Sequence, residues 1–204
     1  MAKPVLYGMA QSRAFRSVWA MEEIGIDWEH RPIHFGKDAK TDAYLAVNPN
    51  GRIPALVDGD LVLFESMAIN LYLAEKYGDG LYPASVEDRA RTHQWSVWGI
   101  SEIEPLQMQI IVQMYFTPDE KKNPKVVESA KKQLERPLGV LDAHLADRAY
   151  LLGDTFTIAD LNLASVLDLL IGMAQHDIGG HANVKRWADA CYARPSYAAA
   201  KARD

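Results

Sequence analysis

The chain has 204 residues, 49% of them hydrophobic, and a formal net charge of −5, which suits one large or two small globular domains. Neither half is basic, with −3 over residues 1–80 and −2 over the rest, and no apolar run could span a membrane, so we expect no nucleic-acid partner and no membrane segment. The single cysteine, Cys191, excludes an intramolecular disulfide, and with no secretory signal at the N-terminus we expect a cytoplasmic protein.

The first 47 residues alternate strand and helix patterns. The predicted elements are a strand at 5–7, a helix opened by Ser12 and stopped by Gly25, a weak strand at 28–33 and a helix at 41–47. Pro32 should keep the second strand at an edge of the sheet, because proline cannot donate to a strand ladder.

The next stretch reads Asn48-Pro49-Asn50-Gly51-Arg52-Ile53-Pro54-Ala55-Leu56. Two apolar runs then flank Asp58-Gly59, which predicts a hairpin, and Glu65-Ser66 opens a helical pattern. The resulting order, β-α-β-α-β-β-α, predicts a thioredoxin-like domain. We also predict a cis Ile53–Pro54 bond.

This stretch could bind a peptide. A cis bond before Pro54 would leave the N–H and C=O of Ile53 free to pair with an extended peptide. Ser66, at a helix N-terminus, would offer a hydroxyl and backbone N–H groups to a carboxylate, and Glu65 could hold an ammonium group. Together these groups describe a γ-glutamyl peptide such as glutathione.

Residues 81–86 form a predicted linker after Gly78-Asp79-Gly80. After this linker the sequence shows helical patterns and no strand pattern. We predict a long aromatic helix over 87–116 that Pro105 should bend, a second over 125–145 that contains Pro137, and a third over 183–193.

One further helix should form the buried centre of this half. Thr157 and Asp160 form a capping box, with Phe156 and Leu161 as its hydrophobic staple, and the residues that follow are almost all apolar. We interpret Asp160 as a helix cap and not as a catalytic residue.

Asn-Pro-x-Gly-Arg-Ile-Pro-Ala-Leu followed by Glu-Ser-x-Ala-Ile-x-x-Tyr-Leu resembles the N-terminal domain of cytosolic glutathione S-transferases, and the capping box resembles their C-terminal half. The resemblance covers essentially the whole chain. It implies an α/β thioredoxin-like glutathione-binding domain over 1–80, a linker over 81–86 and an all-α domain over 87–204 that forms the electrophile pocket. It also implies a homodimer, and a role in detoxification.

Two hydroxyls could stabilise the glutathione thiolate. A free thiol titrates near pH ~8.5, and lowering its pKa by about two units stabilises the thiolate by roughly 2.7 kcal/mol. Ser12 resembles the serine that opens the first helix in the phi and theta classes, and its surroundings resemble bacterial serine-type members. Tyr7 resembles the catalytic tyrosine of other classes. We favour Ser12, although a serine there could also be a plain helix N-cap.

Other residues are weaker candidates for glutathione contacts. Arg52 resembles the residue that contacts the glycyl carboxylate in relatives, and Arg13 and Lys40 could serve the same end. Asn50 could contact the ligand or simply serve the turn.

We expect the electrophile pocket between the two domains. Its candidate lining is apolar or aromatic and comprises Met9, Trp98, Met108, Ile111, Val112, Tyr115 and Phe116, although at least half of these could be helical-core residues. We predict no metal site: Pro32 breaks the helical spacing of His30 and His34, and no carboxylate pattern surrounds His176 and His181.

The favoured hypothesis is therefore an enzyme in which Ser12 holds the thiolate of glutathione against a hydrophobic electrophile or a peroxide. The alternatives are a non-catalytic binding or regulatory protein of the same fold and a dedicated glutathione-dependent lyase or dehalogenase. Relatives without turnover tend to lose polar residues of the glutathione site, whereas this chain retains Ser12, Pro54, Glu65 and Ser66.

Overall fold

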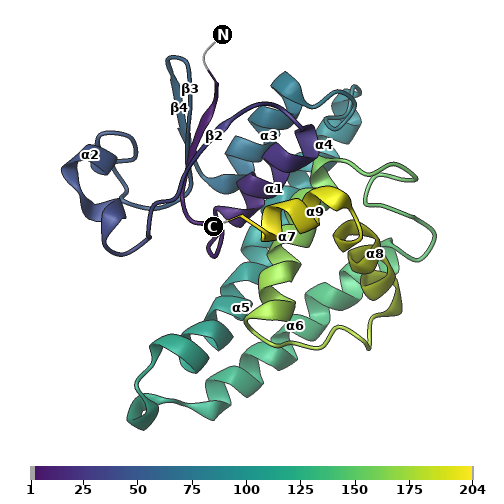
Figure 1. The fold of residues 1–204 in the computed structure, drawn as a ribbon. Coiled ribbons are helices and arrows are strands. Elements are labelled where there is room, and N and C mark those ends of the chain that lie inside the picture. The colour runs from purple at the N-terminus through teal and green to yellow at the C-terminus, as the bar shows by residue number, and fades with distance from the viewer. Residues whose placement is uncertain (1–2, 204) are drawn as a thin grey trace. The chain divides into compact units, whose positions relative to one another are not determined.

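The structure is a computed structural model that describes residues 3–203 (Figure 1). Their contacts divide into two compact units. The first comprises the chain up to Ala84 together with the residues from Ala193 onward, and the second is Ser85–Tyr192.

A four-stranded mixed sheet forms the centre of the first unit. The strands are β1 (Val5–Tyr7), β2 (Glu29–Arg31), β3 (Ala55–Asp58) and β4 (Leu61–Phe64), in the order β2-β1-β3-β4. β1 is parallel to β2 and antiparallel to β3, and β3 is antiparallel to β4. The thioredoxin-like arrangement is confirmed, including the edge position of the strand that precedes Pro32.

The helices of the first unit are α1 (Phe15–Ile24), α2 (Asp42–Leu45), α3 (Ser66–Tyr77), α9 (Pro195–Lys201) and the 3₁₀ segment η1 (Asp38–Lys40). α1 ends where predicted, at Gly25, whose φ of 72° is left-handed and whose N–H donates to Met21. Leu6 and Leu56, paired across β1 and β3, are both fully buried in the core.

The predicted hairpin is confirmed, and it is tied to α3. Gly59, with φ 63°, and Asp60 connect β3 to β4. The Asp58 carboxylate accepts hydrogen bonds from the hydroxyls of Tyr72 and Tyr77, each at 2.7 Å, and from Lys76 at 2.8 Å. These bonds fix the hairpin, and with it the backbone that leads to Ser66.

The last helix differs from the prediction, which included residues from 193 onward in the all-helical domain. α9 packs on α1, so that a helix from the end of the chain lies beside a helix from its beginning (Figure 1). The Trp19 indole N–H donates to Ser196 at 3.1 Å, and the ring of Tyr197 meets that of Trp19 edge-on at 5.1 Å. Arg194 forms an ion pair with Glu23. The last residues therefore complete the first unit.

The second unit is helical. Its α-helices are α4 (Val86–Trp98), α5 (Glu104–Ile111), α6 (Pro124–His144), α7 (Ile158–Gly172) and α8 (Ala182–Tyr192), with π-helical segments η2 (Gly99–Ile103) and η3 (Val112–Phe116) and a 3₁₀ turn η4 (Asp119–Lys121). The predicted helix over 87–116 is thus α4 to η3, and its α-helical geometry is lost just before Pro105. Pro137 lies inside α6 as predicted. Within residues 3–203 no helix is both long and apolar enough to cross a membrane.

Asp160 caps the buried helix α7, as predicted, and joins it to two other segments. One carboxylate oxygen accepts from the Thr157 N–H at 2.9 Å, which closes the capping box. The other accepts from the Leu151 N–H at 2.8 Å and the Trp187 indole at 2.9 Å. Burial raises the pKa of this carboxyl, and the hydrogen bonds oppose the rise.

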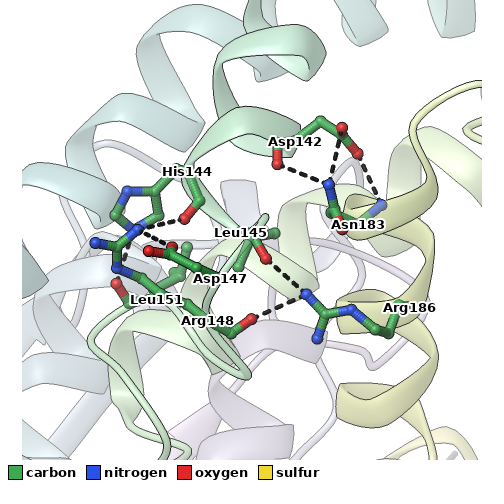
Figure 2. Close-up of polar contacts among 8 residues, drawn as sticks. All are labelled: Asp142, His144, Leu145, Asp147, Arg148, Leu151, Asn183 and Arg186. Atoms are coloured by element: carbon green, nitrogen blue, oxygen red, sulfur yellow. Dashed lines mark hydrogen bonds and ion pairs between the residues drawn. The ribbon is translucent and has the colours of Figure 1, made fainter.

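The C-terminal end of α6 is bonded to the start of α8 (Figure 2). Asp142 accepts from the backbone N–H of Asn183 at 2.8 Å, so a carboxylate from one helix caps the N-terminus of another. Arg186 donates to the carbonyl groups of Leu145, at 2.7 Å, and Arg148, at 2.9 Å. These bonds satisfy backbone groups that helix ends would otherwise leave unpaired.

Candidate functional site

Ser12 lies in a turn that leads into α1. Its hydroxyl donates to the Met9 carbonyl at 2.7 Å, and its Oγ accepts from the Ala14 N–H at 3.0 Å. The helix itself begins at Phe15 with Ala14 at the cap position, so Ser12 is not the N-cap. Both Ser12 and Met9 are half-buried.

Tyr7 is the last residue of β1, and its side chain has partners of its own. Its hydroxyl accepts from Arg31 on β2 at 2.9 Å, and the guanidinium lies 5.4 Å from the ring centroid. The ring is 6.0 Å from that of Tyr44. The Tyr7 oxygen is thus held at the edge strand by a permanent cation.

The backbone at Ile53 follows a turn that is held by hydrogen bonds to the carbonyl of Arg52. The Ile53–Pro54 bond is cis, as predicted. The Arg52 carbonyl accepts from the Tyr44 hydroxyl and the Asn48 amide, both at 2.7 Å. Among the described residues, the N–H and C=O of Ile53 have no hydrogen-bond partner. These two groups are therefore available to an added strand.

The polar candidates around this turn have different surroundings. Lys40 donates to the Gly51 carbonyl at 2.7 Å, and Asn50 bonds through its N–H and its amide to Asn48, so both serve the turn. The Arg52 side chain is exposed. Arg52 and Lys40 are both exposed cations, and the Lys40 ammonium has further donors besides the one bonded to Gly51.

Glu65 and Ser66 lie at the N-terminus of α3. Ser66 is the first residue of the helix and is buried, with its hydroxyl 3.5 Å from the guanidinium of Arg16, which is also buried. Glu65 is exposed and takes φ 72° and ψ 112°, an uncommon backbone conformation for a residue with a side chain. A helix N-terminus, a hydroxyl and a buried cation are the kinds of group that bind anions in proteins.

The residues of the second unit that were predicted to line the electrophile pocket differ in how exposed they are. Val112, Tyr115 and Phe116 belong to η3 and are 41%, 50% and 59% exposed. Trp98 and Met108 are half-buried. Ile111, also considered above, is a core residue, 2% exposed. The other five are therefore not fully buried core residues.

The histidines have structural partners. His30 bonds to the Gly8 carbonyl at 2.8 Å. His176 and His181 lie near a carboxylate from elsewhere in the chain: Glu135 of α6 is 3.8 Å from the Nε2 of His176 and 3.2 Å from the Nε2 of His181. Sequence spacing could not reveal this contact, because the residues are about 40 positions apart. Within residues 3–203 there is no group of three or more His, Cys, Asp or Glu side chains with a geometry suited to a metal.

Comparison with known proteins matches both halves of the chain to family models. Residues 3–75 match the glutathione S-transferase N-terminal domain, and residues 103–195 match the C-terminal domain. The chain is 38% identical to glutathione S-transferase 3 of Zea mays over 206 residues, which cover 97% of this chain and 92% of the relative. The chain belongs to the glutathione S-transferase family.

Solved glutathione S-transferases have the same fold. A theta-class enzyme of Xanthomonas axonopodis pv. citri, with glutathione bound, is 29% identical with a TM-score of 0.90, over 100% of this chain and 99% of that one. Glutathione S-transferase-I bound to lactoylglutathione is 33% identical with a TM-score of 0.88, over 98% and 99%. The present chain is thus a transferase enzyme of this fold. Its bacterial origin stays a prediction.

Two features of this transferase were not predicted from its sequence. Arg16 lies in a helix with buried residues on nearly every side, so the spacing of apolar residues did not reveal that its guanidinium is buried beside Ser66. The left-handed conformation of Glu65 had no signal either, because that region favours glycine and asparagine.

Proposed function

We propose that the chain binds glutathione along the first unit, at the corner formed by Ile53, Pro54, Glu65 and Ser66. The N–H and C=O of Ile53 pair with the cysteinyl backbone of the tripeptide as an added strand. Ser66 and the start of α3 bind the γ-glutamyl carboxylate, and Glu65 holds the ammonium group. The observation that carries this proposal is the buried hydroxyl of Ser66 at a helix N-terminus with Arg16 at 3.5 Å.

We propose that the glycyl end of the tripeptide binds Arg52. Its exposed guanidinium suits the glycyl carboxylate through a bidentate pair. Lys40 and Asn50 support the same end indirectly, because their bonds to Gly51 and Asn48 hold the turn in place.

Ser12 stabilises the thiolate in this proposal. Its Oγ accepts from the Ala14 N–H, which polarises the hydroxyl and makes it a better donor. The Ser12 hydroxyl proton, now donated to the Met9 carbonyl, would turn to the sulfur, a stronger acceptor once it is ionised. Tyr7 ranks second, because its oxygen is already held by Arg31.

The thiolate then attacks a hydrophobic electrophile or a peroxide. We propose that Met9 and the exposed or half-buried Trp98, Met108, Val112, Tyr115 and Phe116 contact this second substrate. A homodimer is also proposed. Three apolar side chains on the edge strand β4, Leu61, Val62 and Phe64, are 38–45% exposed, which supports an interface there. We propose the cytoplasm as the location.

The experiment that tests this function is thiol-specific turnover. The purified protein should be retained on immobilised glutathione and should conjugate glutathione to an activated aryl halide or alkene, or reduce an organic hydroperoxide. Retention without turnover of any of these would favour the binding protein, and turnover of a single halide or thioether would favour the lyase or dehalogenase. If the protein were not retained on immobilised glutathione and turned over none of these substrates, the proposal would be excluded.

Replacing Ser66 with alanine is expected to weaken glutathione binding by about tenfold, because a hydrogen bond to a charged group is lost. Titration calorimetry would measure the change. Ser101→Ala is the matched control. Among residues 3–203 its exposed hydroxyl bonds to the Trp98 carbonyl alone, at 3.4 Å, and the affinity should not change. An unchanged affinity in Ser66→Ala would remove this residue from the site.

A further inference from the structure

The segment between α7 and α8, residues 173–181, has two distinct faces. Ala174, His176 and Ile178 are buried, whereas Gln175 and Asp177 between them are exposed. Buried and exposed residues thus alternate along the segment that follows the C-terminal end of α7. We call this segment the strap.

The strap is held by bonds on both sides of Gln175. The Ala174 N–H donates to the Leu169 carbonyl at 3.1 Å, and the His176 N–H donates to the Leu170 carbonyl at 3.2 Å. The His181 ring lies 3.2 Å from Glu135 on α6. Gln175 thus has little freedom of backbone position.

Gln175 itself is in an unusual conformation and contacts η3. Its φ is 50°, in the left-handed region that residues with side chains rarely occupy. The bond from the His176 N–H to the Leu170 carbonyl shows why this residue is left-handed, because such a bond around a left-handed residue commonly closes the C-terminal end of a helix, here α7. The side-chain amide of Gln175 donates to the hydroxyl of Tyr115 at 3.4 Å, across 60 residues of sequence.

We propose that Gln175 is a positioning residue for Tyr115 and thereby favours electrophiles that carry a carbonyl or nitro oxygen. This inference rests on the proposed function, in which Tyr115 contacts the second substrate. The amide nitrogen can only donate, so the tyrosine oxygen is used as the acceptor and its own proton points to another acceptor. A substrate oxygen can take that proton, whereas a purely apolar electrophile cannot.

The test uses two unreactive ligands that differ in one acceptor group, S-(4-nitrobenzyl)glutathione and S-benzylglutathione. In Gln175→Ala the dissociation constant of the nitro ligand should rise about three- to tenfold, the loss of one hydrogen bond, while that of the benzyl ligand should stay within about twofold. Tyr115→Phe should show the same selectivity, and the double variant should be no worse than Tyr115→Phe alone.

Two further variants separate positioning from damage to the strap. Gln175→Gly removes the amide but accepts a positive φ without strain, so it should match Gln175→Ala. Asp177→Ala alters the same exposed face and should leave both dissociation constants unchanged. With reactive nitrobenzyl and benzyl halides, Gln175→Ala should raise KM for the nitro compound alone, with KM for glutathione unchanged.

Equal weakening of both ligands in Gln175→Ala, or an additive double variant, would overturn the role of Gln175 while leaving glutathione binding intact. Failure of the wild-type protein to bind glutathione itself would instead overturn the proposed function, and this inference with it.

Discussion

Replacing Ser12 with alanine is expected to slow glutathione conjugation by about 10²-fold while changing the KM for glutathione by less than about threefold. The hydroxyl acts on the sulfur only when it is ionised, and the peptide is held by other residues. The pKa of the bound thiol should rise by about two units, back towards that of a free thiol. The pH profile of kcat/KM would measure this rise.

Two controls accompany the Ser12 variant. Ser12→Thr keeps a hydroxyl and should retain most of the turnover. Tyr7→Phe removes the rival hydroxyl and should have a much smaller effect. If Tyr7→Phe raised the thiol pKa and Ser12→Ala did not, the two residues would exchange roles.

Replacing Asp160 with alanine should lower the free energy of unfolding by about 4 kcal/mol, since it leaves several buried donors unpaired. These donors are the N–H and hydroxyl of Thr157, the Leu151 N–H and the Trp187 indole, and the carboxylate is fully buried. Urea unfolding at a fixed protein concentration would measure the loss.

The exposed Asp154 provides the matched control, and Asp154→Ala should change stability by less than about 0.5 kcal/mol. Asp160→Asn keeps the shape and one acceptor oxygen, so it should lie between Asp160→Ala and the wild type. An Asp160→Ala protein within about 1 kcal/mol of the wild type would show that water satisfies the donors instead.

Most of the fold could be predicted because its signals are local. The Asp58-Gly59 turn, the stop at Gly25 and the Thr157–Asp160 box each depend on residues a few positions apart, and all three are confirmed. α9 was not predicted. It is short, and its stability comes from ring and ion-pair contacts with α1, which lies some 170 residues earlier in the chain.

The site was predictable where the backbone determines it and not where distant side chains meet. Ile53 and Ser66 could be identified because a proline and a helix start mark them. The contacts of Arg16 with Ser66, across 50 residues, and of Arg31 with Tyr7, across 24, follow from packing that no local pattern records. Which hydroxyl serves the sulfur is therefore the point on which sequence alone could say least.

The packing of α9 on α1 has a consequence for synthesis of the protein. The N-terminal residues emerge from the ribosome long before α9 is synthesised. α1 therefore lacks the contacts that α9 makes with Trp19 and Glu23 until that later stage. Ser85–Tyr192 can assemble during that interval. The sheet-containing unit that begins the chain therefore completes its folding only after Ser85–Tyr192 has been synthesised.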